Sequence, residues 1–257
     1  ELNLSTDYIG AEAAGPGHHA ASLVVEGSWL DEAEIEQSWT ESRRLDLLIR
    51  SSSPVGINLP WVADFSSSLP FRNLFLQASS WIPQEADGDT WNTGEALDLD
   101  DRGWVRSLAT GGAAGVLIAR GIDGKYPGGS YVLTYEGQGV LETYHDARIT
   151  GASPGRLELT VEPSDAGIHL KLVDTSPEDP LRNIKLTPEA WEEDLLRRTF
   201  HPDFLRNLRP FSVLRFAAWQ RINDSPVERW QQRTRPFDAV QTGPGGVALE
   251  LMLRLCN

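Results

Sequence analysis

Short apolar runs separated by turn-forming residues fill the chain between Gly115 and Leu186, and this pattern constrains the fold most. Six runs carry apolar residues at nearly alternate positions: Val116–Arg120, Tyr131–Tyr135, Val140–Tyr144, Leu157–Val161, Ile168–Val173 and Arg182–Leu186. Glycine, proline, serine and aspartate stand between them. Strands at regular spacing with such turns are typical of an antiparallel β-sandwich. We therefore predict a jelly-roll-like β-sandwich over residues 111–187.

Two strand–loop–helix segments flank this region. The first has an apolar strand at Val55–Leu59, a loop with aromatic and acidic residues, and a predicted helix at Leu69–Trp81 with three- and four-residue apolar spacing. The second has a strand at Val213–Phe216, a polar loop, and a predicted helix at Gly246–Asn257. In a βα unit the loop after the strand carries the chemistry, so both loops are candidate binding regions.

Together these segments predict a nested, multi-domain α+β architecture. The β-sandwich is expected to be inserted between the first two βα units of an incomplete (β/α)8-type barrel, since parallel strands are joined by a crossover that can hold a domain. The predicted divisions are an N-terminal arm with a helical segment, the first βα unit, an acidic loop, the sandwich, and a linker helix with a truncated second βα unit: residues 1–52, 53–84, 85–110, 111–187 and 188–257.

Local signals refine the ends of these divisions. Residues 1–20 are predicted to be a loose arm and residues 31–50 one helix or a helix–strand pair, because acidic residues precede arginines there. Thr187 followed by Pro188 and Glu189 predicts the start of the linker helix.

Composition excludes several classes of function. The formal net charge is −14, and an acidic surface repels phosphate backbones, so we expect no nucleic-acid partner. No segment is long and apolar enough to predict a membrane span. The single cysteine, Cys256, allows no internal disulfide, which is compatible with the cytosol or with export.

The sequence predicts no cofactor and no metal site. Asp98, Asp100 and Gly103 partly fit a calcium-binding loop within the acidic residues 85–101. However, Arg102 and Ala109 occupy positions where such a loop places oxygen ligands, which favours a solvated acidic loop.

The candidate binding residues are polar and aromatic side chains at or after the two flanking strands: Asn58, Trp61, Asp64, Arg215, Trp219, Arg221, Asn223 and Asp224. Sugar rings stack their C–H faces on indole, and their hydroxyl groups pair with Asn, Asp and Arg. Trp61 and Trp219 are therefore predicted to contact sugar, the alternative being that each packs where sandwich and barrel meet. Asp64 and Asp224 are not assigned as a catalytic pair, because an aspartate after a strand more often forms a turn.

Several motifs resemble a known family. They occur in order along the chain from about residue 55 to the end: Gly56-Ile-Asn-Leu-Pro-Trp-Val-Ala-Asp-Phe-Ser66, Tyr126-Pro-Gly-Gly-Ser-Tyr-Val132, Asp179-Pro-Leu-Arg-Asn-Ile184, Phe211-Ser-Val-Leu-Arg-Phe216 and Asn223-Asp-Ser-Pro-Val227. The set resembles a bacterial secreted family described as cellulose-binding or carbohydrate-binding. That family is similar in layout to the retaining glycoside hydrolases built on (β/α)8 barrels.

The resemblance implies roles for the flanking strands. Val213–Phe216 would be the second barrel strand, and Arg215 near its end would support the nucleophile or would be a structural arginine. The acid/base and nucleophile carboxylates of such enzymes lie on later strands, so the chain is expected to be an N-terminal part that is inactive alone.

The leading hypothesis is thus an exported carbohydrate-active protein, secreted, periplasmic or on the cell surface. It would bind, and in a complete form hydrolyse, a β-linked polysaccharide or oligosaccharide. The alternative is a non-catalytic structural or assembly subunit. Expected protein partners are a second chain completing the barrel or further copies of this chain.

Overall fold

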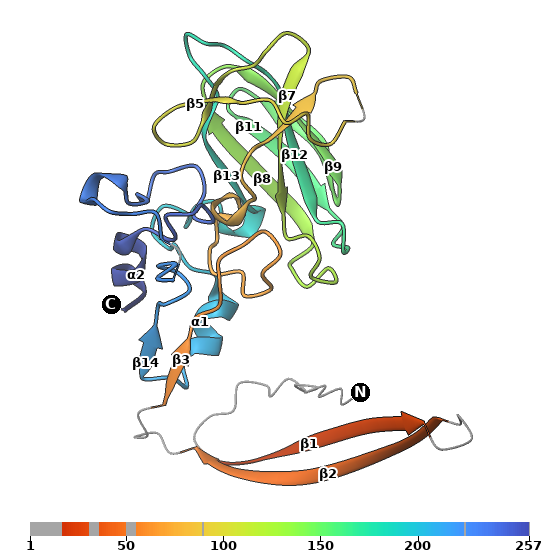
Figure 1. Ribbon diagram of the computed structural model, residues 1–257. Helices are drawn as coiled ribbons and strands as arrows, with labels where there is room; N and C mark the ends of the chain where they lie inside the picture. The colour runs from red at the N-terminus through yellow and green to blue at the C-terminus, as the bar shows by residue number, and fades with distance from the viewer. Residues whose placement is uncertain (1–16, 31–35, 50–54, 89, 224, 257) are drawn as a thin grey trace. The chain divides into compact units, whose positions relative to one another are not determined.

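A computed structural model describes residues 17–30, 36–49, 55–88, 90–223 and 225–256, with side chains described from residue 55 onward (Figure 1). The chain divides into two compact units. The N-terminal unit comprises residues 1–57 and 206–213, and the main unit comprises residues 58–205 and 214–257.

The N-terminal unit contains a long antiparallel pair. Strand β1 (Gly17–Leu30) pairs with β2 (Glu36–Ile49), with Gly17 opposite Ile49 and Leu30 opposite Glu36. The predicted helix within residues 31–50 is therefore wrong where the structure describes it, and residues 17–20 of the predicted arm lie in β1. Acidic residues followed by basic residues are only a weak signal for a helix. Here the segment pairs with the 14 residues of β1 instead, and these tertiary contacts outweigh the local preference.

Two four-stranded antiparallel sheets dominate the main unit (Figure 1, gold through green to teal). The first has the order β10–β11–β8–β13, with bounds Ala147–Ser153, Arg156–Val161, Gly129–Glu136 and Arg182–Pro188. The second has the order β4–β7–β12–β9, with bounds Ile82–Glu85, Gly112–Ile118, Ile168–Thr175 and Gly139–His145. A short pair, β5 (Asp98–Leu99) and β6 (Val105–Ser107), precedes β7.

The two sheets share one hydrophobic core. On β12, Ile168, Leu170 and Leu172 are each 0% exposed, while the alternate positions face the other side of the sheet. Leu133 and Leu159 of the first sheet belong to the same cluster. All six predicted runs lie wholly or largely within strands, so the antiparallel core of the prediction agrees with the structure. Strands β4 and β10 were not predicted.

The predicted barrel fragment is wrong. Strands β3 (Gly56–Asn58) and β14 (Val213–Arg215) do form a two-stranded sheet. The amide of Ser212 donates to the carbonyl of Val55 at 2.9 Å, and that of Leu59 donates to Arg215 at 3.0 Å, so the strands run parallel. The first expected βα unit is absent from the described residues, because no α-helix follows β3 in residues 69–81.

Residues 69–81 contain a single 3-10 turn, η1 (Leu74–Gln77), instead of the predicted helix. Most of their apolar side chains are buried, with Phe71 and Phe75 each 0% exposed, while Leu76 and Trp81 are half-buried. An amphipathic surface helix would keep one polar face in solvent. The apolar residues at three- and four-residue spacing belong instead to a loop that packs on the core.

Only two α-helices occur in the part of the chain that the structure describes, α1 (Pro202–Leu208) and α2 (Leu249–Cys256). The predicted C-terminal helix is confirmed over α2. The predicted linker helix is a 3-10 turn, η2 (Glu189–Trp191), where Pro188 rather than Thr187 precedes the first turn and no side chain caps it. None of the described helices is long and apolar enough to cross a bilayer.

Candidate functional site

One concavity of the main unit gathers several of the predicted binding residues. It has a volume of about 350 Å³ and is called the Trp61 cleft below. The predicted residues in its lining are Trp61, Asp64 and Arg221. Phe65, Ser79, Ser80 and Thr242 complete its aromatic and polar surface. The volume lies near the lower end of the range of small-ligand pockets, about 300–1,000 Å³.

The loop after β3 orients the aromatic residues of the cleft. Leu59 and Val62 are 1% and 4% exposed, whereas Trp61 and Phe65 are 47% and 60% exposed. The buried residues anchor the loop in the core, and the aromatic rings of Trp61 and Phe65 are left at the surface. A surface indole held in this way is a preformed platform for an apolar ligand face.

The end of β7 fixes two walls of the cleft. The Arg120 side chain donates to the Asp64 carboxylate at 2.6 Å, and the Arg120 amide donates to the Asp64 carbonyl at 3.1 Å. Ser79 donates from its amide to the Leu117 carbonyl and accepts from the Leu117 amide on its hydroxyl, at 2.8 and 2.9 Å. Because each wall is bound twice to one strand end, the cleft is preorganised.

Arg221 is held in the cleft by an unusual backbone turn. Residues 216–220 form one helical turn, after which the Arg221 amide donates to the Ala218 carbonyl and the Ile222 amide to the Ala217 carbonyl. These two bonds define a Schellman motif with Arg221 at the position usually occupied by glycine. Arg221 has φ of 50°, a left-handed conformation that costs a non-glycine residue about 1–2 kcal/mol.

The Arg221 side chain lies across Trp61 and contacts the C-terminal segment, residues 225–256. Its guanidinium carbon is 4.6 Å from the centroid of the Trp61 ring, and one terminal nitrogen donates to the Thr242 carbonyl at 2.9 Å. Asp64 is already ion-paired with Arg120. Among the residues that the structure describes, no acidic side chain forms an ion pair with Arg221, and its guanidinium adds a positive charge to the cleft lining.

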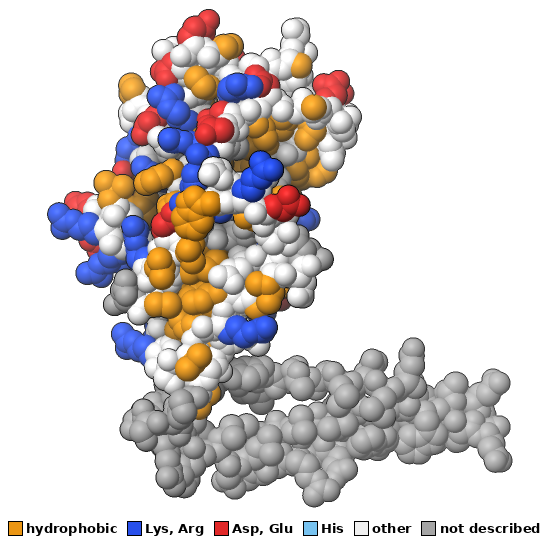
Figure 2. All heavy atoms as spheres, turned by 60° about the vertical axis from the view of Figure 1, so that its left-hand side comes forward, with side chains coloured by type: hydrophobic (Ala, Val, Ile, Leu, Met, Phe, Trp, Pro, Cys, Tyr) orange, Lys and Arg blue, Asp and Glu red, His pale blue; other side chains and the backbone are white. Residues whose placement is uncertain are grey.

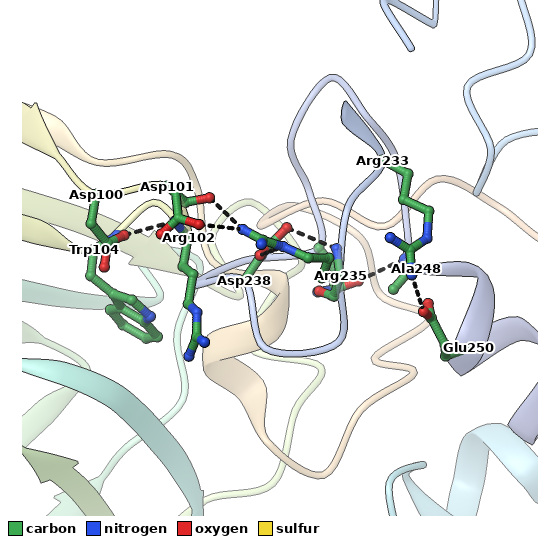
Figure 3. A network of polar contacts seen from close by, with 10 residues as sticks. Asp100, Asp101, Arg102, Trp104, Arg233, Arg235, Asp238, Ala248 and Glu250 are labelled. Carbon is green, nitrogen blue, oxygen red and sulfur yellow. Dashed lines mark hydrogen bonds and ion pairs between the residues drawn. The ribbon is translucent and has the colours of Figure 1, made fainter. Parts of the chain in front are cut away.

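A polar network holds the C-terminal segment that supplies Thr242 (Figure 3). The Arg235 guanidinium donates to the Asp101 carboxylate at 3.2 Å and to the Asp238 carboxylate at 3.1 Å, and these acids raise the pKa of Arg235. The Gln241 side chain donates to the Arg235 carbonyl and accepts from the Ala248 amide. Figure 3 shows Arg233 reaching Glu250 at the far end of this network.

The same segment is also joined to η1. The Gln241 amide donates to the Leu76 carbonyl and the Thr242 hydroxyl donates to the Ala78 carbonyl, both at 2.6 Å. Since Thr242 and Ser79 are thereby attached to one short stretch of chain, they keep their positions relative to each other.

The remaining predicted residues lie elsewhere. Arg215 and Asn58 are exposed and share a hydrogen bond of 3.1 Å, but they do not line the cleft. Trp219 is 1% exposed and packs against other aromatic rings, so the predicted sugar contact of this residue is wrong; the expected junction with a barrel is absent from the described residues as well. Asn223 is exposed outside the cleft lining, and Asp224 lies outside the described residues.

Sequence reasoning did not identify four polar or aromatic residues of the cleft, Phe65, Ser79, Ser80 and Thr242. It also did not identify the ion pair between Arg120 and Asp64. Phe65 directly follows Asp64 and could have been found from its place in the same loop. Ser79, Thr242 and Arg120 carry no local signal, because only the folded chain brings them to the loop after β3.

A second aromatic group lies on the outer side of the sheet β4–β7–β12–β9. His169 is 7% exposed, and its ring centroid is 5.0 Å from that of Trp91 and 5.3 Å from that of Tyr144. The Tyr144 hydroxyl donates to Glu142 at 2.6 Å, and the His169 Nε2 lies 3.2 Å from Gln84 Oε1. These polar groups satisfy one another, so this group makes a weaker candidate for binding than the Trp61 cleft.

The acidic residues before β6 form local hydrogen bonds. Asp98 accepts from Arg106 and Ser107, and Asp100 accepts from the amides of Arg102 and Trp104. Their oxygens therefore close the β5–β6 turn.

Comparisons of the chain with protein-family models, with curated proteins and with solved structures found no match. The resemblance to a carbohydrate-binding family therefore stays a prediction.

Proposed function

We propose that this protein binds a carbohydrate in the Trp61 cleft. The observation that carries the proposal is the half-exposed Trp61 indole inside a concavity that also presents a carboxylate, a guanidinium and hydroxyl groups. A sugar needs this combination, because its C–H face stacks on an aromatic ring while its hydroxyl groups exchange hydrogen bonds with polar side chains.

Binding without hydrolysis is the activity that the cleft supports best. Retaining hydrolysis requires two carboxyl groups about 5–5.5 Å apart on either side of the scissile bond. Asp64 is the acidic residue that lines the cleft, and its carboxylate is ion-paired with Arg120. We propose that the protein acts outside the cytoplasm, which follows from the resemblance alone.

The proposal is tested by measuring retention on β-linked polysaccharides, cellulose included, and titration with soluble oligosaccharides. The Trp61→Ala variant is expected to lose at least about tenfold in affinity, or about 1.4 kcal/mol. Trp91→Ala is the matched control, since Trp91 is 44% exposed, against 47% for Trp61, and lies outside the cleft.

An equal loss in Trp91→Ala would move the binding site to the outer face of the sheet and contradict the proposal. Lack of retention on every glycan would favour the second candidate function.

The second candidate is a structural or assembly subunit. It is supported by large apolar side chains of the C-terminal segment that are exposed, with Trp230, Phe237 and Leu253 at 62%, 70% and 56%. Figure 2, turned toward this segment, shows hydrophobic side chains gathered in a band with lysine and arginine side chains beside it. Exposed apolar patches of this kind mark surfaces for association.

Sedimentation over a range of protein concentrations tests this candidate. Reversible self-association that is reduced in Phe237→Asp would support it, and a monomer throughout the range would count against association between copies of this chain.

A further inference from the structure

We infer that the carbohydrate bound in the Trp61 cleft is anionic and that Arg221 holds its carboxylate or sulfate group. This inference rests on the proposed function and adds the class of ligand.

Arg221 has more hydrogen-bond donors than its described neighbours use. A guanidinium has five N–H donors, and the Arg221 side chain uses one nitrogen for the Thr242 carbonyl. Its remaining donors have no hydrogen-bond partner among the described residues. A ligand for this position must therefore supply acceptors, and an anionic oxygen pair fits the planar fork best.

The positive charge of Arg221 also favours an anionic ligand. The Asp64 carboxylate in the cleft is ion-paired with Arg120, whose side chain approaches it at 2.6 Å. The Arg221 charge has no such partner among the described residues that line the cleft. A neutral sugar would leave this charge uncompensated, whereas an anionic sugar would form a charge-assisted pair with it.

The backbone conformation at Arg221 also indicates a role for its side chain. The Schellman position with φ of 50° favours glycine, and the two backbone bonds of the motif do not require a side chain. Backbone conformations that oppose the residue type occur preferentially at ligand-binding positions. The long cationic side chain at this position is therefore explained by what it contacts, which is Trp61 and the open cleft.

Arg221 and Trp61 lie close enough together to contact the same sugar ring. With the guanidinium carbon 4.6 Å from the indole centroid, a sugar that packs against the exposed part of the indole lies beside the guanidinium. A charged group on that sugar ring is then within reach of the remaining donors.

The test is calorimetric titration of the full chain with three probes of the same length. They are a β-linked oligosaccharide of uronic acids, its methyl ester and a sulfated neutral oligosaccharide. The free acid is expected to bind about tenfold or more tightly than the ester, because a hydrogen bond to a charged group is stronger than one to a neutral group. The sulfated probe then distinguishes recognition of carboxylate from recognition of sulfate.

Arg221→Gly tests the residue. Glycine suits the backbone at this position, so the variant is expected to fold and to bind acid and ester with the same affinity. Arg197→Ala is the control, since it removes the same charge from an exposed arginine outside the cleft. It is expected to keep the preference of the wild type.

The outcomes separate the two proposals. Equal affinity of wild type for acid and ester, with neither charged probe preferred, overturns this inference but leaves carbohydrate binding in place. A preference for the acid that survives in Arg221→Gly also overturns it. Lack of binding to all three probes and to neutral glycans overturns the proposed function as well.

Discussion

The guanidinium of Arg221 stacks on the indole of Trp61, with 4.6 Å between the guanidinium carbon and the ring centroid. This contact joins the loop after β3 to the turn after β14. A cation–π pair at a half-exposed site contributes only about 0.5–1 kcal/mol. The pair therefore contributes little to the free energy of unfolding, so changes of affinity in variants of Trp61 or Arg221 can be attributed to the cleft.

Trp219 is expected to be a determinant of stability. Its ring lies 6.0 Å from Phe71, 6.1 Å from Phe204 and 5.6 Å from Phe216, and the residue is 1% exposed. Trp219→Ala should lower the free energy of unfolding by about 3–5 kcal/mol, measured by denaturant titration. Trp230→Ala, at 62% exposed, should change it by less than about 0.5 kcal/mol, and similar losses in both would contradict the assigned core.

Gly246 is expected to tolerate no side chain. It has φ of 72°, and a Cβ there would lie 2.2 Å from the Trp219 carbonyl oxygen, which accepts from the Val247 amide. Gly246→Ala should cost about 2 kcal/mol or more, because the crowding adds to the conformational term. At Gly121, where φ is 65° and the space is open, alanine should cost only about 1 kcal/mol. Equal thermal midpoints for Gly246→Ala and Gly121→Ala would contradict the close contact between position 246 and the Trp219 carbonyl.

His169 is expected to make stability depend on pH in the acid range. Burial, then the nearby His145 and Lys171, lower the pKa of His169 from 6.5 to about 4. The unfolded chain therefore binds a proton that the folded chain does not bind. The stabilisation is full above pH 6.5 and is lost as the pH falls toward 4.

Unfolding free energies measured across this range check the expectation, with His169→Gln as the comparison. The variant should lack part of the slope between pH 6.5 and 4. Glu142 and the other nearby charges stay in place in both proteins, so an unchanged slope would contradict the low pKa.

Two tyrosines are expected to resist ionisation. Burial and then a hydrogen bond to Asp146 raise the pKa of Tyr126, and burial raises the pKa of Tyr131, both above the usual value of 10.0. The stabilisation they give is present below pH 10 and is lost as the pH rises toward the higher folded-state values. Absorbance titration should show these groups ionising only with unfolding, and Tyr126→Phe should remove part of the alkaline loss.

The sheet strands could be predicted from sequence because their signal is local. Ile168, Leu170 and Leu172 alternate with His169 and Lys171, and the structure buries the first set in the core. Residues 69–81 show where local reasoning fails. Phe71 and Phe75 have the spacing of a helix, but both are fully buried in the core. The spacing of apolar residues therefore does not indicate the backbone conformation here.

The candidate site was half predictable for the same reason. Trp61 and Asp64 follow a strand, and this placement identified them. Arg221, which lies over Trp61, was identified from the composition of its loop, but Trp219 in the same loop is buried in the core. Burial of a tryptophan depends on tertiary contacts, which a single sequence does not encode in any local pattern.

Strand β4 precedes the other seven strands of the two sheets in sequence and covers one edge of β7. A shortened protein that starts at residue 111 would uncover that edge and expose a row of unpaired amides and carbonyls, a template for aggregation. The shortest soluble fragment containing both sheets is therefore expected to start before Ile82.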